Sequence, residues 1–365
     1  MAIQKITIEQ FLELSSQYPV LDVRSPGEYT HAHIPGAHSL PLFTDEERKV
    51  VGTAYKQQSR QAAIKIGLDY FGVKMRKMVE EVELKLTGKQ KNSANEQPST
   101  NNVLIHCWRG GMRSAGVAWL LDLYGFKVYT LVGGYKAYRK WVRDQFEKPY
   151  QFMILGGYTG SAKTEVLHQL KKEDLPVIDL EALAHHKGSA FGALGESAQP
   201  TQEMFENLLA QDLSCLERSI KGNIFIEDES QRIGLLKLPD PFWATMRKSN
   251  ICFLDIPFEE RLNYLAAAYG KYEKEKLVNA IIRIQKRLGG LETKTAIGYL
   301  LEDNYKECFR ILLKYYDKWY AKGLFNRGNI DALLTKIVFD KIEISVLTTA
   351  VKETTKNITV PALND

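Results

Sequence analysis

The chain has 365 residues, of which 44% are hydrophobic and 25% are charged. This composition is typical of a soluble globular protein, and the length favours two domains over one. The opening stretch, MAIQKITIEQFLEL, mixes charged and apolar side chains, so we expect neither a signal peptide nor a transit peptide. Because no apolar run is long enough to cross a bilayer, we expect a cytoplasmic protein without a membrane partner.

Charge and cysteine content further limit the kinds of partner and structural site to expect. The 49 basic and 44 acidic residues leave a net charge of +5, which suits a nucleic-acid partner without establishing one. The four cysteines (Cys107, Cys215, Cys252 and Cys308) lie far apart and form no C-x-x-C pair. We therefore expect neither a disulfide framework nor a structural metal site, and at most one cysteine with a special role.

Residues 1–145 alternate β-rich runs with a helical stretch. Strands are predicted at 19–24, 103–107 and 127–134, and helical spacing of apolar residues runs through 113–123. This alternation predicts a first α/β domain with a parallel sheet.

A polar segment and a boundary follow from composition. Residues 87–102 contain Pro and Gly and almost no apolar side chain, which predicts an exposed insertion in the first domain. The domain boundary is predicted near 146–150, where Pro149 follows a charged helix.

The same alternation resumes after the boundary. Four further strands are predicted, at 152–155, 176–180, 223–227 and 251–256. They predict a second α/β domain over 150–325 whose part from residue 258 onward is helical. The tail, 326–365, is β-branched and polar, and its pattern assigns it no structure.

The string HCWRGGMRS (106–114) joins a predicted strand to a predicted helix. Its two glycines let consecutive backbone N–H groups converge on one point, and the helix N-terminus adds partial positive charge. Arg109 and Arg113 are expected to add further positive potential. The thiol of Cys107 should therefore have a lowered pKa and act as a nucleophile, rather than merely fill space at a strand end.

Two chemistries fit this loop, because His-Cys-x5-Arg-Ser also matches the phosphate loop of tyrosine phosphatases. A phosphatase would need a general acid for its leaving group, and no acid loop is evident. The strings LDVRSPGEYTHAHIPGAHSLPL (21–42) and LVGGYKAYRKW (131–141) strongly resemble the rhodanese family. The resemblance covers about residues 5–145 and implies a rhodanese fold in which Cys107 carries a terminal sulfur.

Other polar residues of this region receive structural roles. Asp22 and Arg24 form a charged pair at a strand end, which usually orders the neighbouring turn. His31, His33 and His38 are not at metal-ligand spacing, and we expect them to serve in turns and packing.

A second motif lies in FMILGGYTGSAKTEVL (152–167), an apolar strand followed by a glycine loop and a helix start. Residues 157–164 match the Walker A pattern, except that Ala162 replaces the usual Gly. Backbone amides of the loop would face phosphates, Lys163 would neutralise them, and Thr164 is placed to coordinate Mg²⁺. The predicted phosphate-binding residues are Gly157, Gly160, Ser161, Lys163 and Thr164.

Acidic residues follow two neighbouring strands. NIFIEDES (223–230) is a plausible Walker B strand with Glu227 and Asp228 at its end, and the sequence does not decide between the two. Asp179 lies where P-loop kinases place a substrate-binding acid.

Three further segments are candidates for contact with a ligand or with RNA. The loop 179–192 contains His185 and His186, although a solvated loop would have the same composition. Arg283, Lys286 and Arg287 fall on nearby turns of a predicted helix, as a solvated face, a lid or a tRNA-backbone contact. In LLKYYDKWY (312–320), core packing is favoured over base stacking.

Several strings together closely resemble the tRNA 2-selenouridine synthase family, over about residues 5–320. They are PLFTDEERKVVGTAYKQ (41–57), CWRGGMRS, GGYTGSAKTE, DLEALAHHKGSAFG, IEDESQRIG (226–234) and IQKRLGGL. The resemblance implies an enzyme that replaces the sulfur of wobble 2-thiouridine in tRNA with selenium from selenophosphate, which implies a selenophosphate-producing enzyme as a partner. It also implies S-geranylation from geranyl diphosphate. The residues suit a diphosphate in the P-loop and selenium carried by Cys107, while the sequence leaves open which anion binds at which loop.

Other functions remain open at this point. A rhodanese-type sulfurtransferase fused to a small-molecule kinase would consume ATP and need no tRNA. A non-catalytic P-loop module would change affinity for tRNA without taking part in the chemistry.

Overall fold

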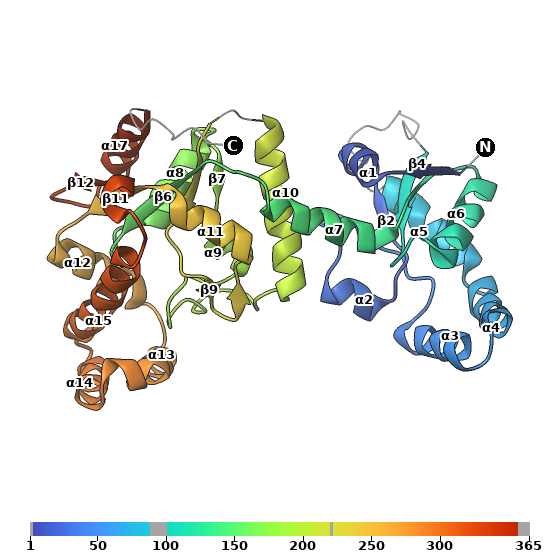
Figure 1. Cartoon of the computed structure of the whole chain (residues 1–365). Helices are drawn as coiled ribbons and strands as arrows, with labels where there is room; N and C mark the ends of the chain where they lie inside the picture. Colours follow the sequence, from blue (N-terminus) through green and yellow to red (C-terminus); the bar gives the residue numbers. More distant parts are fainter. Residues whose placement is uncertain (1–2, 88–100, 220–221, 357–365) are drawn as a thin grey trace. The chain divides into compact units, whose positions relative to one another are not determined.

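The computed structural model describes residues 3–87, 101–219 and 222–356. Contacts divide the chain into two compact units, Met1–Asp144 and Gln145–Asp365 (Figure 1). Each unit has its own parallel sheet with helices, so the predicted α/β class is confirmed for both. The predicted insertion at 87–102 lies almost entirely outside the described residues.

The first unit is built on a five-stranded sheet in the order β1-β5-β4-β2-β3, with every pairing parallel. Its strands are β1 (Gln4–Ile6), β2 (Val20–Asp22), β3 (His38–Ser39), β4 (Asn102–His106) and β5 (Lys127–Leu131). Its helices are α1 (Ile8–Leu14), α2 (Pro26–His31), α3 (Asp45–Gln57), α4 (Arg60–Gly72), α5 (Met75–Thr87), α6 (Met112–Tyr124) and α7 (Gly134–Phe146), the last of which crosses the division.

Burial explains why these segments form strands. All three residues of β2 and the last four of β4 are buried, as expected of parallel strands covered on both faces. Register aligns Asp22 with His106, so β2 and β4 end side by side at the carboxyl edge of the sheet. The residue after β4, Cys107, therefore lies at this edge, where parallel sheets usually carry their functional residues.

The second unit also has a five-stranded parallel sheet, in the order β12-β11-β6-β8-β7. Its strands are β6 (Phe152–Gly157), β7 (Val177–Ile178), β8 (Ile224–Glu227), β11 (Asn250–Asp255) and β12 (Leu334–Val338), with a small antiparallel hairpin of β9 (Arg232–Ile233) and β10 (Leu236–Lys237). Its helices are α8 (Lys163–Lys172), α9 (Leu180–Ala184), α10 (Gln202–Ser219), α11 (Asp240–Lys248), α12 (Phe258–Tyr269), α13 (Lys274–Leu288), α14 (Gly290–Leu301), α15 (Tyr305–Phe325), α16 (Ile330–Leu333) and α17 (Ile344–Lys356).

The helical stretch predicted from residue 258 is present as α12 to α15, which pack around their own apolar cluster. Within the described ranges, no helix combines the length and apolar character needed to span a membrane.

The tail left unassigned by its sequence completes the second sheet. β12 pairs in parallel with β11, and α17 packs beside α8 (Figure 1). Leu347 and Val351 of α17 are fully buried in the cluster that covers this face of the sheet. The described part of the tail, to residue 356, therefore belongs to the second unit's core.

Candidate functional site

The thiol of Cys107 lies in a short loop between β4 and α6. The sulfur accepts a hydrogen bond from the backbone N–H of Gly111 at 3.3 Å, and it lies 3.3 Å from the hydroxyl of Ser114. Burial alone would raise the pKa of Cys107, but hydrogen bonds from Ser114 and from the amides of Arg109 and Gly111 outweigh it and leave the pKa below its usual value. The loop therefore favours the thiolate, the reactive form of a cysteine.

The glycine segment after β5 fixes this loop. A Cβ atom on Gly134 would lie 2.3 Å from the carbonyl oxygen of Cys107, and one on Gly110 would lie 2.5 Å from that of Leu131. Both glycines have positive φ, at 57° and 63°. The N–H of Tyr135 also donates to the carbonyl of Cys107 at 2.8 Å. Such close backbone approach requires glycine at both positions.

The ion pair between Asp22 and Arg24 is buried near the loop of Cys107, and it has the structural role predicted for it. The Arg24 guanidinium donates to Asp22 and to the carbonyl of Ala32, and it lies 3.8 Å from the ring centroid of Tyr135. His106 is fully buried between Phe11 and Tyr135. Burial lowers the pKa of His106 to about 4, so its ring is neutral near pH 7.

The two arginines of the loop have different surroundings. Arg113 was predicted to add positive potential at the thiol, but its guanidinium forms an ion pair with Glu28 at 2.6 Å. Burial opposes ionisation of Glu28, yet the hydrogen bonds and charge of Arg113 hold the pKa of this carboxyl below its usual value. The side chain of Arg109 is exposed. Hydrogen bonds from Ser114 and from backbone amides are therefore the main contributions that lower the pKa of Cys107.

The second motif forms a loop between β6 and α8. Gly157 and Gly160 have φ values of 149° and 82°, and Ala162 adopts a left-handed conformation with φ 55° and ψ 32°. A left-handed backbone is where glycine normally stands, which explains why the Walker A pattern has glycine at this position. Lys163 donates to the carbonyl of Gly157 at 3.1 Å, so its ammonium group lies over the loop.

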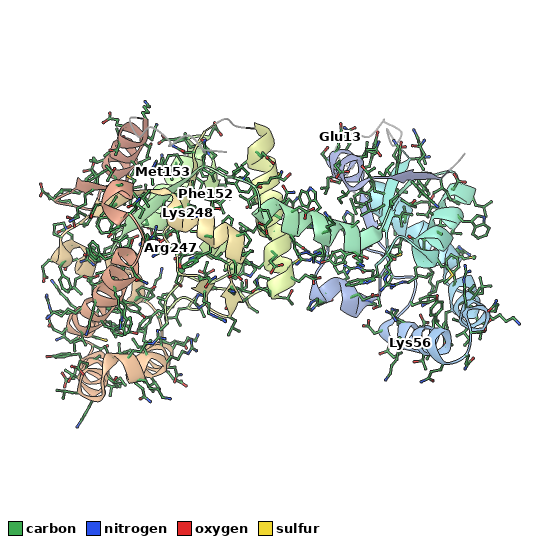
Figure 2. The ribbon with its side chains drawn as sticks, viewed as in Figure 1. Glu13, Lys56, Phe152, Met153, Arg247 and Lys248 are labelled. Atoms are coloured by element: carbon green, nitrogen blue, oxygen red, sulfur yellow. The ribbon has the colours of Figure 1, made fainter. Side chains whose placement is uncertain are left out.

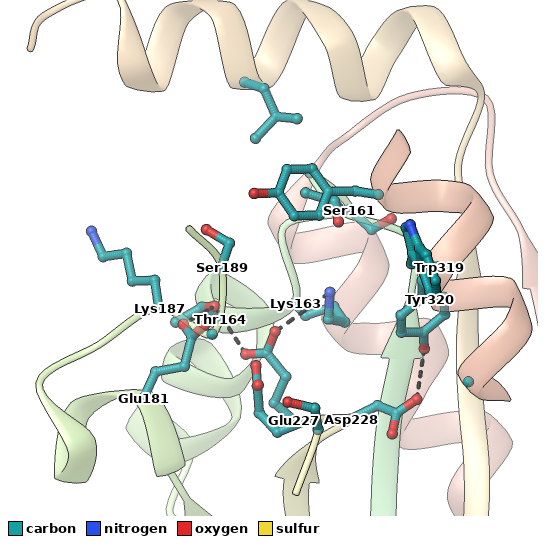
Figure 3. Close-up of a pocket in the computed structure, with 18 of the residues that line it drawn as sticks. Ser161, Lys163, Thr164, Glu181, Lys187, Ser189, Glu227, Asp228, Trp319 and Tyr320 are labelled. Atoms are coloured by element: carbon teal, nitrogen blue, oxygen red, sulfur yellow. Dashed lines mark hydrogen bonds and ion pairs between the residues drawn. The ribbon is translucent and has the colours of Figure 1, made fainter. Parts of the chain in front are cut away.

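Glu227 is the carboxylate that joins this loop. The hydroxyl of Thr164 donates to Glu227 at 3.0 Å and lies 3.3 Å from Glu181, and Lys163 lies 3.4 Å from the second oxygen of Glu227 (Figure 3). Carboxylate oxygens of Glu181, Glu227 and Glu229 lie within 4.8 Å of one another. Burial first, and then mutual repulsion, raises the pKa of Glu181 and of Glu229, and burial raises that of Glu227 against the charge of Lys163.

The other two predicted acids have different partners. Asp228 accepts a hydrogen bond from the hydroxyl of Tyr320 at 2.8 Å and pairs with Arg327 (Figure 3). Asp179 caps α9 through the N–H of Ala182 and lies 2.7 Å from His168. Glu181, two residues further along, occupies the place by the phosphate loop that the sequence assigned to Asp179.

The phosphate loop opens into a cavity of about 670 Å³. Its wall is rich in aromatic side chains, among them Trp243, Tyr264, Tyr269, Tyr272, Tyr315 and Trp319. As predicted for 312–320, Tyr315 and Tyr316 pack against the apolar core of the helical part; together with Trp319 they also line this cavity. The cavity therefore has a polar, phosphate-loop end and an aromatic wall.

Arg261, which the sequence did not single out, holds the loop against the helical part. It is buried and donates to the carbonyl of Thr159 at 3.0 Å and to Asp317 at 2.9 and 2.8 Å. Because Thr159 belongs to the phosphate loop and Asp317 to α15, this pair couples the loop to the aromatic helix.

Of the three basic residues predicted on the helix as lid or tRNA contacts, one lines the cavity. Arg287 lines it and lies 5.6 Å from the ring centroid of Trp319. Lys286 and Arg283 are exposed on α13, outside the cavity wall.

The predicted histidine contacts are also displaced. His185 lies 2.8 Å from the hydroxyl of Ser197, and His186 is buried against Gly192 and Gly234. The loop reaches the cavity through residues 187–189 instead.

Comparisons with known proteins cover both units. A family model described as a rhodanese-like domain matches residues 7–140, and one described as the tRNA 2-selenouridine synthase AAA domain matches residues 150–330. Curated tRNA 2-selenouridine synthases of three bacteria are 34% identical to this chain. They come from Bdellovibrio bacteriovorus (90% of this chain, 94% of that protein), Hydrogenovibrio crunogenus (86% and 93%) and a Sulfurovum species (85% and 92%). The resemblance stated from the sequence is thereby confirmed, and the chain belongs to the tRNA 2-selenouridine synthase family.

Proposed function

We propose that this enzyme converts wobble 2-thiouridine in tRNA to 2-selenouridine, in two steps. The first step makes an S-geranylated nucleoside from geranyl diphosphate, and the second exchanges the geranylthio group for selenium from selenophosphate. The observation that carries the proposal is the cavity that begins at Lys163 and continues along an aromatic wall. Such a site suits an allylic diphosphate, which has a charged head and an apolar chain.

In the first step, the sulfur of 2-thiouridine attacks C1 of geranyl diphosphate. A C–S bond forms, the C1–O bond breaks, pyrophosphate leaves with the electron pair, and the N3 proton of the base is lost to water. Negative charge grows on the leaving oxygen, where Lys163 and the backbone N–H groups of the phosphate loop would stabilise it.

Mg²⁺ would assist the first step by stabilising charge on the pyrophosphate. Thr164 and Glu227 are the residues that would hold it, with Glu181 and Glu229 beside them. The donor set fits, because hydroxyl and carboxylate oxygens are the ligands that Mg²⁺ prefers. Burial of three carboxylates next to one lysine also leaves the cluster short of positive charge.

In the second step, we assign the first nucleophile to Cys107, because its loop favours the anionic, nucleophilic form. The Cys107 thiolate attacks C2 of the modified base and displaces geranylthiolate, which takes a proton from water; selenium of selenophosphate then attacks C2 and displaces the Cys107 thiolate. Water then attacks phosphorus, so that the P–Se bond breaks and phosphate is released. The donor would come from a selenophosphate-producing enzyme.

Mass spectrometry of nucleosides tests the proposal. Purified protein would be incubated with 2-thiouridine-containing tRNA, geranyl diphosphate and selenophosphate, beside Cys107→Ala and Lys163→Ala variants. We expect a geranyl adduct that is lost in Lys163→Ala, and a selenium-for-sulfur mass shift that is lost in Cys107→Ala. Unchanged nucleosides together with ATP consumption, or with sulfur transfer from thiosulfate to a thiol, would instead support the sulfurtransferase–kinase alternative.

A further inference from the structure

Arg327, just after α15, is a buried arginine with incomplete hydrogen bonding. Its side chain is 4% exposed and its Nη2 pairs with Asp228. Among the described residues, none accepts a hydrogen bond from its Nε or Nη1. A buried guanidinium with two unsatisfied N–H positions is costly, and Arg327 also lines the cavity. Both N–H positions are themselves buried, so the side chain would have to turn toward the cavity that it lines before they could donate to a ligand there.

A second arginine lines the same cavity. Arg247, on α11, donates to the carbonyl of Gly323 at 3.1 Å and lies 5.4 Å from the ring centroid of Trp243 (Figure 2). Burial first, and then the charge of Arg327, lowers the pKa of Arg247. Two guanidinium groups thus influence each other, and Asp228 pairs with one of them. The three side chains together carry an uncompensated positive charge.

Hydrogen bonds through Tyr320 connect this arginine pair to the phosphate loop, although the two groups have different carboxylate partners. Tyr320 donates to Asp228 at 2.8 Å, and its oxygen accepts from the N–H of Gly157 at 3.1 Å (Figure 3). Lys163 turns instead toward Glu227, at 3.4 Å. The phosphate loop and the arginine pair therefore place different hydrogen-bond donors in one cavity.

We propose that Arg247 and Arg327 form a second phosphoryl-binding site in the cavity, separate from the phosphate loop. Guanidinium groups suit phosphoryl oxygens because they offer several charged N–H donors in a fixed plane. The ligand is either a backbone phosphate of the RNA substrate or a free phosphate-type anion. The role of this site in the reaction rests on the function proposed above, whereas its binding chemistry does not.

Binding to the full-length protein tests the site directly. Inorganic thiophosphate or an anticodon stem–loop RNA would be titrated by calorimetry into the wild-type protein and into Lys163→Ala, which separates binding at the phosphate loop from binding at the arginine pair. We expect Arg247→Gln to weaken one of these ligands about tenfold or more, as loss of a charged hydrogen bond does. Lys248→Gln is the matched control, because Lys248 is the exposed neighbour on the same helix (Figure 2).

A second variant guards against misfolding. The double substitution Asp228→Asn with Arg327→Gln removes both members of the buried pair, and it should weaken the same ligand as Arg247→Gln. Selective loss of thiophosphate would identify a free anion, and selective loss of RNA would identify the backbone. Equal affinities of Arg247→Gln and Lys248→Gln for both ligands would overturn the site. Ligand binding that depends on Arg247 in a protein that modifies no nucleoside would contradict the proposed function alone.

Discussion

The hydroxyl of Thr164 and the carboxylate of Glu227 are joined by a hydrogen bond of 3.0 Å. This contact ties the end of the phosphate loop to the end of the neighbouring strand β8. It also shows that the two acids at the end of β8 have different partners, because Asp228 pairs with Arg327 and accepts a hydrogen bond from Tyr320. Glu227 is therefore the acid that we expect to act with the phosphate loop.

Replacing Glu227 by Gln should slow geranylation about 100-fold or more, because the amide would hold Mg²⁺ less well, and Mg²⁺ is the ion proposed to stabilise charge on the leaving pyrophosphate. The measurement is the initial rate of geranyl-nucleoside formation at several Mg²⁺ concentrations. Asp179→Asn is the control, since that carboxylate caps α9 and pairs with His168. It should keep the rate within about twofold of wild type and change stability little, because Asn caps a helix about as well as Asp does. A Glu227→Gln enzyme of unchanged rate would refute the assignment.

Ala162 carries backbone strain that glycine would remove. An L-residue in a left-handed conformation costs roughly 1–2 kcal/mol, which the glycine variant would save. Glycine also makes the unfolded chain more flexible, which lowers the stability of the variant by about 0.4–1 kcal/mol and offsets part of that saving. Thermal unfolding of Ala162→Gly should therefore begin no earlier than in wild type. Ala162→Val should unfold earlier, because a β-branched side chain tolerates positive φ poorly. Earlier unfolding of the glycine variant would show that the alanine methyl contributes packing that outweighs the strain.

Local patterns were sufficient to predict the central strands of both sheets and both loops, but not β1, β3 or β12. A buried run followed by glycines and a helix has one common arrangement, so Cys107 lies just after a strand and Lys163 begins the helix after its glycine loop, as expected. The tail was harder, because β12 is an edge strand with alternating partial exposure and has no strong apolar run. Its place beside β11 depends on pairing with a strand about 80 residues earlier, which periodicity does not reveal.

Side-chain partners were the other limit. Glu181 and Asp179 are both acids near the end of β7, and only the backbone turn at the start of α9 decides which one meets Thr164. Likewise, Arg113 lies in the predicted loop, but Glu28, which neutralises it, is 85 residues away. Long-range pairing of charges is therefore what the sequence left undetermined.

Cys107 should be alkylated at a lower pH than an ordinary thiol. Its pKa is lowered by Ser114 and by loop amides, so the reactive thiolate persists as pH falls. Ser114→Ala should raise the midpoint of the pH–rate profile. Peptide mapping by mass spectrometry would follow each cysteine, since Cys215 is exposed, and burial raises the pKa of Cys252 and of Cys308 to about 12. An unchanged midpoint in Ser114→Ala would show that the amides alone stabilise the thiolate.

His106 should make the first unit sensitive to mild acid. Its folded pKa, about 4, lies below its unfolded value of about 6.5, so the unfolded state binds the proton more readily. The contribution of His106 to stability is complete above pH 6.5 and is lost as pH falls toward 4, by roughly 3 kcal/mol at most. His106→Phe, which preserves the ring between Phe11 and Tyr135, should lose less stability between pH 7 and pH 5 than wild type does. Thermal unfolding at the two pH values measures this difference. Equal losses in the two proteins would mean that other groups, such as the carboxyl of Asp22, govern the acid sensitivity of this unit.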